Sequence, residues 1–211
     1  IISHFHAMFS LGGMAGAAAG SMLLGWRVDA MTHLVGVAVA GALAIVVACG
    51  QMLPPEPAAG EDAGFRLPRG VLLLLGTLAA LGLVAEGAMY DWSVLYLHDE
   101  LGSPQDQAAL AYASFSGAMA LARFGGDWVR SRTSPATLMR ASAALSTLAM
   151  AAVLLLAHPV VALVGFALVG IGLGNVVPVL FSAASRVPGT TPAHGIAAVS
   201  SIGYLGFMAG P

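Results

Sequence analysis

The chain has 211 residues, of which 58% are hydrophobic, only 9% are charged, and none is lysine. A soluble domain carries roughly 25% charged residues, so this composition excludes a domain that folds in water. Because lipid cannot satisfy exposed backbone N–H and C=O groups, the apolar stretches must be helical. The predicted fold class is all-α, a polytopic transmembrane helical bundle.

Seven apolar stretches are long enough, or nearly so, to cross a bilayer core of about 30 Å, which takes roughly 20 residues. In chain order they cover residues 5–26, 33–53, 70–97, 107–127, 136–157, 159–182 and 194–211. The only connection that resembles a linker is 54–69, which reads PPEPAAGEDAGFRLPR. The other connections are short, so we expect sequential spans to pack as antiparallel neighbours.

In the first span, Gly12, Gly16 and Gly20 recur every fourth residue. Small residues at this spacing form a helix face on which another backbone can approach closely. The stripe predicts helix packing. It is compatible with static packing and with a smooth surface on which two halves of a transporter rock.

Metal and cofactor chemistry are not predicted. His4 and His6 are two residues apart and point to different faces of a helix. Cys49 is the only cysteine, so no disulfide can form within the chain. The sequence also has no HExxH, GxSxG or nucleotide-binding loop. We therefore expect no metal, no cofactor and no enzymatic activity.

The arginines indicate an orientation. If the first span runs outward from the cytoplasm, Arg27 is on the outer side, and the inner side holds Arg66, Arg69, Arg123, Arg130, Arg132, Arg140 and Arg186. This asymmetry follows the positive-inside rule. The outer connection between the third and fourth spans is acidic, with Asp99, Glu100 and Asp106. Arg140 is expected to snorkel to the inner surface.

Glu86 is the strongest candidate for a functional residue. Counted from the start of the third span, it lies about 24 Å from the inner edge at 1.5 Å per residue, toward the outer face. An intramembrane carboxylate is a functional-site hypothesis by default, here for binding substrate or a proton. Tyr90, one turn later, could donate a hydrogen bond to it. The alternatives are a carboxylate satisfied by a neighbouring helix or one that snorkels to the outer surface.

Further along this span, Asp91, Trp92 and Tyr96 fall at the outer rim. Both aromatic residues suit the interfacial belt. Asp91 is a candidate for an outer gate.

Asn175 and Pro178 follow the run GIGLGN in the sixth span. A dinucleotide fingerprint is excluded, because no strand precedes these glycines. Glycine and proline here instead allow a bend or local unwinding, as in transporter helices that line a cavity. Asn175 is a candidate for substrate binding or an interhelical hydrogen bond. At about 22–24 Å from the outer edge it should lie too far below Glu86 to touch it.

The stretch GAMALARFGGDWVRSR at the end of the fourth span resembles the second-half copy of the signature loop of the major facilitator superfamily. Three further stretches, HFHAMFSLGGMAGAAAG, AEGAMYDWSVLYL and AHGIAAVSSIGYLGFMAGP, are similar to that family's helices five, seven and eleven, in this order. The loop residues that carry the resemblance are Arg123, Gly126, Asp127, Arg130 and Arg132.

The resemblance covers the whole chain as helices five to eleven of twelve, and it implies a bundle truncated at both ends. Residues 1–53 would be the last two helices of the N-terminal half, 54–69 the cytoplasmic central linker, and 70–211 the first five helices of the C-terminal half. The partners it implies are a small-molecule solute, the lipid bilayer and the missing helices of the same polypeptide.

The resemblance also implies a role for the loop. Topology alone explains the arginines but not Asp127. With Arg130 and Arg132, Asp127 would form a charge-paired latch that holds the inner face in one state. Because Arg123 lies four residues before Asp127, an intrahelical pair between them also stays open.

The function implied is secondary active or facilitative transport by alternating access in a bacterial inner membrane, with protons as one option for a coupling ion. The alternative is a non-transporting receptor or scaffold, which would not need a carboxylate deep in a span. No nucleic-acid partner is expected. A sugar, a drug-like molecule and an organic anion stay open as solutes. The scarcity of buried arginine mildly disfavours a strongly anionic one.

Overall fold

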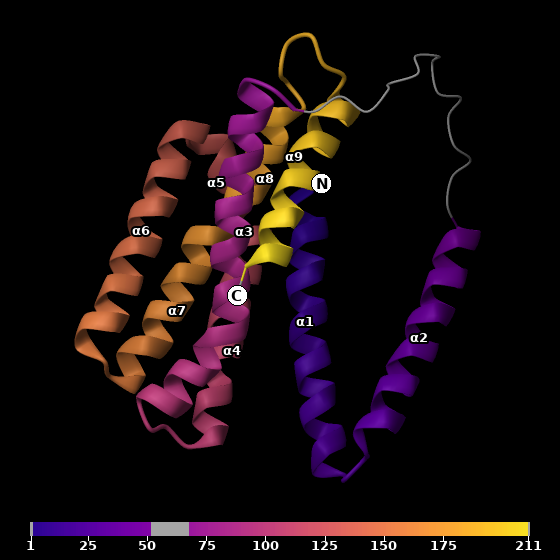
Figure 1. Ribbon diagram of the computed structural model, residues 1–211, viewed down its shortest axis with the longest axis vertical. Helices are drawn as coiled ribbons and strands as arrows, with labels where there is room; N and C mark the ends of the chain where they lie inside the picture. The colour runs from indigo at the N-terminus through magenta and orange to yellow at the C-terminus, as the bar shows by residue number, and fades with distance from the viewer. Residues whose placement is uncertain (1, 52–67, 211) are drawn as a thin grey trace. The chain divides into compact units, whose positions relative to one another are not determined.

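The computed structural model describes residues 2–51 and 68–210, and Figure 1 shows them as a set of helices. In chain order these are α1 (Ile2–Gly25), α2 (Ala30–Gly50), α3 (Val71–Leu95), the π-helix η1 (Tyr96–Glu100), α4 (Gln105–Phe124), α5 (Gly126–Arg132), α6 (Pro135–Leu156), α7 (Pro159–Gly174), α8 (Val176–Ala184) and α9 (Pro192–Ala209). The described residues contain no strand, and the predicted all-α class is confirmed.

Every predicted span coincides with helix. Within the described residues, four segments are long and apolar enough to cross a membrane, namely Ala30–Gly50, Val71–Glu100, Pro135–Leu156 and Pro159–Ala184. The other three predicted spans coincide with α1, α4 and α9. Of these three helices, α4 is the least apolar, and it begins with the polar run Gln-Asp-Gln. That these three helices cross the bilayer stays a prediction.

The chain forms two compact units, one of Ala15–Arg66 and one that joins Ile1–Met14 to Leu67–Pro211. The larger unit contains α3 to α9. The predicted linker, 54–69, lies almost wholly outside the described residues.

Local sequence explains where several helices of the larger unit begin. Three of them start with a capping residue followed directly by proline: Ser134–Pro135 for α6, His158–Pro159 for α7 and Thr191–Pro192 for α9. The cap side chain accepts a backbone N–H of the first turn, and proline at the first helical position loses no hydrogen bond because its N–H would have no partner there.

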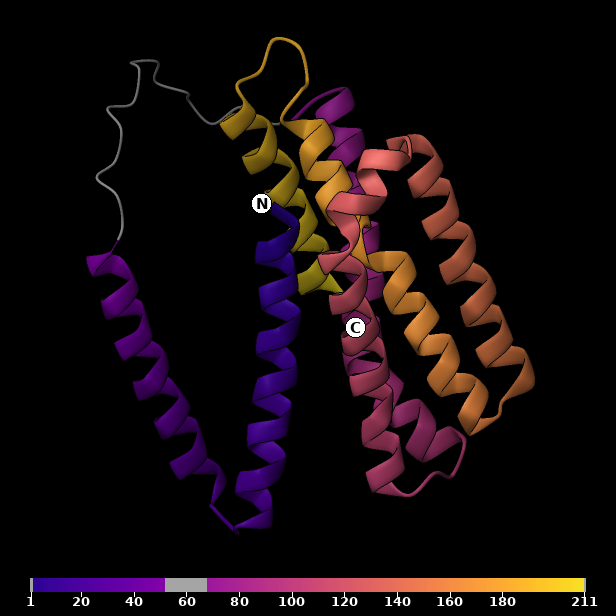
Figure 2. The same cartoon turned by 180° about the vertical axis from the view of Figure 1, so that it is seen from behind.

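In the larger unit, α3 packs along α9, while α4 and α6 both pack along α7 (Figures 1 and 2). The expectation that sequential spans are neighbours is therefore wrong for the consecutive pair α4 and α6, whereas it holds for α6 and α7. Glycines on α7 explain this arrangement. A Cβ added at Gly170 would collide with the carbonyl oxygen of Phe115 in α4, and one at Gly172 would lie 3.0 Å from the carbonyl oxygen of Ser142 in α6.

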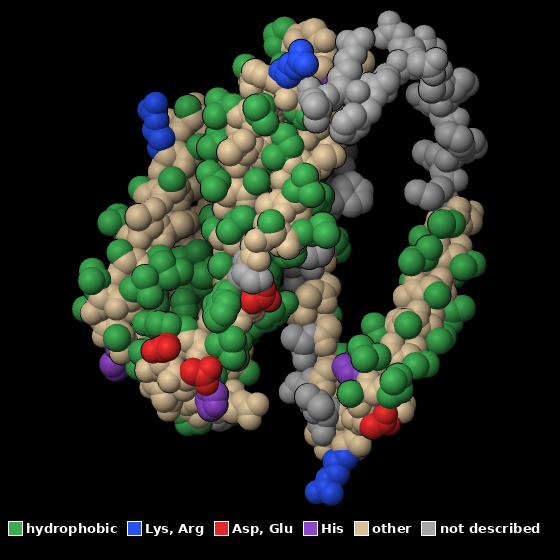
Figure 3. All heavy atoms as spheres, viewed as in Figure 1, with side chains coloured by type: hydrophobic (Ala, Val, Ile, Leu, Met, Phe, Trp, Pro, Cys, Tyr) green, Lys and Arg blue, Asp and Glu red, His purple; other side chains and the backbone are tan. Residues whose placement is uncertain are grey.

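The charged side chains visible on one face of this unit lie mainly at its two ends. In Figure 3, basic side chains lie at the end where α6 begins, and acidic side chains gather at the opposite end near η1. This agrees with the asymmetry read from the sequence. The end where α3 and α6 begin is called the inner end below.

Two hydrophobic clusters fill the larger unit. One contains Met89 and Phe115, and the other, nearer the inner end, contains Leu83 and Val177. Along α3, Glu86 lies between the residues that belong to one cluster and those that belong to the other. The core is thus interrupted by a charged layer.

Candidate functional site

The charged layer is an ion pair between Glu86 of α3 and Arg123 of α4. The Arg123 Nη2 atom lies 2.9 Å from both carboxylate oxygens of Glu86. The two side chains are only 2% and 4% exposed. Removing two charges from water costs several kcal/mol per ion, and such a pair persists only where the geometry and additional hydrogen bonds compensate.

One additional hydrogen bond comes from a break in the sixth predicted span. Pro178 has no backbone N–H, so the carbonyl of Gly174, four residues earlier, has no helical partner at that position. Arg123 Nε donates to this carbonyl over 3.4 Å. The chain ends α7 at Gly174 and restarts as α8 at Val176. The predicted bend or unwinding is confirmed. The Gly174 carbonyl that the break leaves without a helical partner accepts a hydrogen bond from the buried Arg123.

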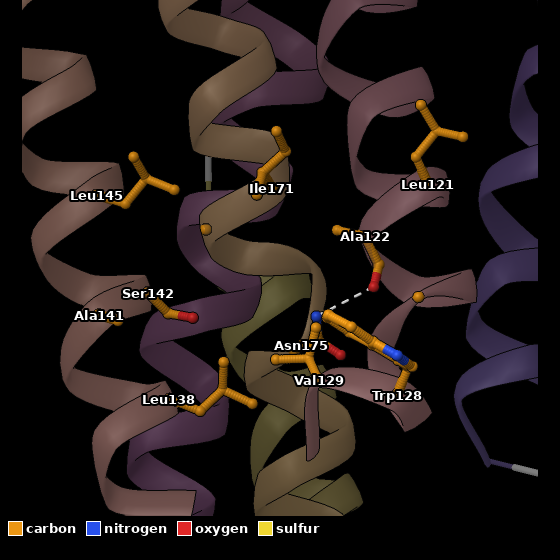
Figure 4. A pocket seen from close by; sticks show the side chains of 12 residues that line it. Leu121, Ala122, Trp128, Val129, Leu138, Ala141, Ser142, Leu145, Ile171 and Asn175 are labelled. Carbon is orange, nitrogen blue, oxygen red and sulfur yellow. Dashed lines mark hydrogen bonds between the residues drawn. The ribbon is translucent and has the colours of Figure 1, made fainter. Parts of the chain in front are cut away.

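A second polar layer lies next to this break. The Asn175 amide nitrogen donates to the carbonyl of Ala122 over 3.1 Å, as Figure 4 shows. Its Oδ1 accepts from Arg130 Nη1 at 3.3 Å. Arg130 also forms an ion pair with Asp127 across one turn of α5. Asn175 therefore connects α7 to both α4 and α5.

Gly126 makes the close approach of α5 to Asn175 feasible. A Cβ added at Gly126 would collide with Asn175 Oδ1 and would lie 3.2 Å from Arg130 Nη1. A larger residue would displace the Asn175 amide or push α5 away from the break. Of the signature-loop residues, the structure thus brings Gly126, Asp127 and Arg130 together around one amide.

Arg132 lies apart from this group. Its guanidinium carbon is 4.3 Å from the centre of the Trp128 ring. Both residues are exposed. A role for Arg132 in the latch therefore stays a prediction.

The wide separation expected between Glu86 and Asn175 needs correction. The continuous segment from Val71 to Glu100 has 30 residues, which is about 45 Å at 1.5 Å per residue and exceeds the roughly 30 Å hydrocarbon core. Counting from the start of the span therefore does not fix the depth of Glu86, which stays a prediction. The structure pairs it with Arg123 near the end of α4, and Arg123 also reaches Gly174, the neighbour of Asn175. Glu86 and Asn175 thus lie in adjacent layers.

The surroundings expected for Arg123 also need correction. The sequence groups it with the arginines of the inner loops and span ends, but its side chain is one of the largest fully buried ones among the described residues. The bundle therefore does contain a buried arginine, and a scarcity of buried arginine is no longer an argument against an anionic solute. The sequence signal that could have located it is the pair of lone charges, Glu86 and Arg123, within two apolar helices.

The other candidate residues have simpler surroundings. The half-buried Tyr90 ring lies 5.3 Å from the ring of Tyr112 and 5.1 Å from that of Phe115. A hydrogen bond from Tyr90 to Glu86 stays a prediction. Asp91 is exposed, and its role as an outer gate is likewise untested. Arg140 is exposed near the inner end of α6.

The glycine stripe of α1 shows little close packing. A Cβ added at Gly12 or Gly16 would have no described atom within 4 Å, and one at Gly20 would lie 3.5 Å from the ring of His33. The close helix approaches of the larger unit occur instead at glycines of α5, α7 and α9. Packing through the stripe stays a prediction.

Metal chemistry is not indicated by the part of the chain that the structure describes. No group of three or more His, Cys, Asp and Glu side chains is placed there to hold a metal ion. The chemistry available at the site is thus charge pairing and hydrogen bonding within an apolar bundle.

Comparison with known proteins agrees with this description. Residues 1–211 match the family model described as Major Facilitator Superfamily. The chain is 31% identical to an uncharacterised MFS-type transporter of Yersinia pestis over 211 residues, which is 100% of the chain and 55% of that protein. It is 30% identical to an uncharacterised transporter, y4wD, of Sinorhizobium fredii over 213 residues, again 100% of the chain and 56% of that protein.

A third relative, the membrane protein MosC of Rhizobium meliloti, is 34% identical over 140 residues, which is 66% of the chain and 34% of that protein. The chain spans about half the length of the first two relatives. No solved structure matches it. The family match over the whole length, together with the apolar helices and the signature loop, identifies the chain as a member of the major facilitator superfamily and an integral, multi-pass membrane protein.

Proposed function

We propose that the protein transports a small solute across a bacterial inner membrane by alternating access, as a secondary active or facilitative transporter. The observation that carries this proposal is the Glu86–Arg123 pair, buried between α3 and α4 and bonded to the break in α7. Ionisable residues inside a bundle of membrane helices mark substrate and ion pathways by default. A helix interrupted at the same level supplies a point at which the bundle can bend.

In this proposal Asp127 and Arg130 form the inner latch, and Asn175 links the latch to the helix break. The pair is partly exposed, with side chains 45% and 23% accessible, so solvent screening limits it to roughly 0.2–1 kcal/mol. A bias of this size changes a two-state ratio by at most about fivefold. The latch therefore tunes the balance between inward-open and outward-open states and does not lock either of them.

Glu86 is the candidate for solute or proton binding, with Tyr90 and Asn175 as further candidates. Proton uptake at Glu86 requires that Arg123 move away first, because the carboxylate is otherwise compensated. Once Arg123 has left, the buried carboxylate is an uncompensated charge, and a proton removes that charge. Coupling to protons therefore needs a state in which the Arg123 guanidinium no longer contacts the Glu86 carboxylate.

The latch is tested by accessibility labelling that needs no known solute. The protein is expressed from its complete coding sequence in a background in which every cysteine, including Cys49, is replaced by serine. Single cysteines then replace Ala197, Ser201 and Tyr204, which are exposed along α9. A membrane-impermeant maleimide is added from each side in turn. We expect labelling from both sides, with the ratio changed about two- to fivefold by Asp127→Asn.

Unchanged labelling on both faces in Asp127→Asn would contradict the latch. Labelling from one face only, at all three positions, would contradict alternating access. Proton coupling is tested separately in proteoliposomes that contain a pH-sensitive dye, with a panel of sugars, organic anions and cationic drug-like compounds. Glu86→Gln should abolish any solute-dependent pH change. A pH change of parental size in that variant would rule out the proton role.

A further inference from the structure

An apolar pocket of about 510 Å³ opens next to the charge network, between α4, α5, α6 and α7. Figure 4 shows the residues around it: Leu138, Ser142 and Leu145 on α6, Ile171 on α7, Asn175 directly after α7, and Trp128 on α5. Its volume falls in the range of roughly 300–1,000 Å³ that is usual for small-molecule sites.

The surface of this pocket suits a hydrocarbon chain better than a polar solute. Asn175 uses one N–H on the carbonyl of Ala122 and one lone pair of its oxygen on Arg130. Ser142 and the indole N–H of Trp128 are the other polar side-chain groups in the lining. Since α6 and α7 both belong to segments long and apolar enough to span the membrane, we expect lipid chains to reach the pocket.

The side of the pocket formed by α5 carries an aromatic ring and a positive charge. Trp128 lines the pocket and is 63% exposed. The Arg132 guanidinium stacks on its ring at 4.3 Å. Tryptophan is typical of the membrane–water interface. An arginine at that level attracts anionic lipid headgroups, at about 1 kcal/mol for each basic residue.

We propose that this pocket binds the acyl chain of an anionic phospholipid of the inner leaflet, with the headgroup held by Arg132. The bound chain would pack against Trp128 on one side and Asn175 on the other. It would therefore support the contact between α5 and α7 on which the Arg130–Asn175 hydrogen bond depends. This proposal requires membrane insertion but not the transport function.

Trp128 supplies the probe for a test. In the full-length protein, every other tryptophan is replaced by phenylalanine, including Trp26 and Trp92. The protein is then reconstituted into phosphatidylcholine vesicles that contain a small fraction of lipid with brominated acyl chains. Bromine quenches tryptophan fluorescence only at short range. Brominated phosphatidylglycerol should reach half-maximal quenching at about one fifth the mole fraction of brominated phosphatidylcholine.

Three variants distinguish binding in the pocket from contact with the surrounding bulk lipid. Arg132→Gln should remove most of the fivefold preference, whereas Arg186→Gln, which removes an equal charge elsewhere on the inner side, should leave it intact. Ala141→Phe, which fills the pocket, should weaken quenching by both lipids. Equal quenching by the two lipids in the parent would overturn the proposal. An equal loss of preference in Arg132→Gln and Arg186→Gln would also overturn it, because the effect would then be general surface charge.

Discussion

Removing either member of the Glu86–Arg123 pair should destabilise the protein, and the effects of the two substitutions should not be additive. Glu86→Gln keeps the shape of the side chain but leaves Arg123 charged and buried. Breaking a buried pair in this way costs about 3–5 kcal/mol, because an uncompensated charge stays in the core. The relatives are about twice as long as this chain, and for a protein of that length each kcal/mol corresponds to roughly 1–2 °C in Tm, because the unfolding entropy scales with length. We therefore expect a decrease of about 5 °C.

Arg123→Met should cost a similar amount, because it leaves the Glu86 carboxylate without its cation. It also removes the hydrogen bond to the Gly174 carbonyl, which is worth about 1 kcal/mol. The double variant, Glu86→Gln with Arg123→Met, leaves no buried charge. Its Tm should therefore fall by clearly less than the sum of the two single effects, with a coupling energy of at least about 2 kcal/mol.

The assay is thermal unfolding of the full-length protein in one detergent, with Asp91→Asn as the control. Asp91 is on the same helix and is exposed, so its substitution should change stability by less than about 0.5 kcal/mol. Additive effects of Glu86→Gln and Arg123→Met would refute the reasoning. They would mean that the two side chains do not form a pair in the membrane protein.

Two further predictions concern helix packing and pH. Gly170→Ala should lower the free energy of unfolding by about 1–3 kcal/mol in thermal unfolding, since the added methyl group would collide with the Phe115 carbonyl. The control is Gly12→Ala, whose methyl group meets no described atom within 4 Å and which should be neutral or stabilising. Equal effects of the two substitutions would contradict this packing. Hydrogen bonds from Thr32 lower the pKa of Asp29 below its usual 3.8, so Asp29 supports the start of α2 above pH 3.8 and loses that effect as the pH falls through its lowered pKa. Amide exchange in the first turn of α2, corrected for intrinsic rates, should thus rise only in acid, and a rise near neutral pH would exclude Asp29 as the cause.

Much of the fold can be predicted from composition and periodicity. The seven apolar stretches coincide with helix, and the break near Asn175 follows from Pro178 and the glycines before it. Helix partners are harder to predict, because the hydrophobic effect does not distinguish one apolar helix face from another within lipid. The glycines that decide the packing, such as Gly170, are recognisable only once their neighbours are known.

The site was only partly predictable for a related reason. Glu86 stands out in the sequence as a carboxylate inside an apolar span. Its depth depends on how far α3 extends beyond the bilayer core, and counting from one end cannot determine that. Arg123 was assigned to the loop because it precedes the Gly-Gly-Asp turn, although its side chain points into the bundle. Arg123 also donates a hydrogen bond to the backbone carbonyl of Gly174. No side chain in the sequence indicates that this carbonyl is available.

The buried pair and the inner latch meet at one peptide unit. Arg123 is bonded to the carbonyl of Gly174, and Arg130 to the side chain of Asn175, the next residue. A displacement of the α7–α8 break therefore alters both hydrogen bonds at once, whichever side of the membrane it starts from. In the alternating-access mechanism proposed above, this shared contact would couple the core of the bundle to its inner face. Alternating access requires such a coupling, because the inner face must open only when the core is in the matching state.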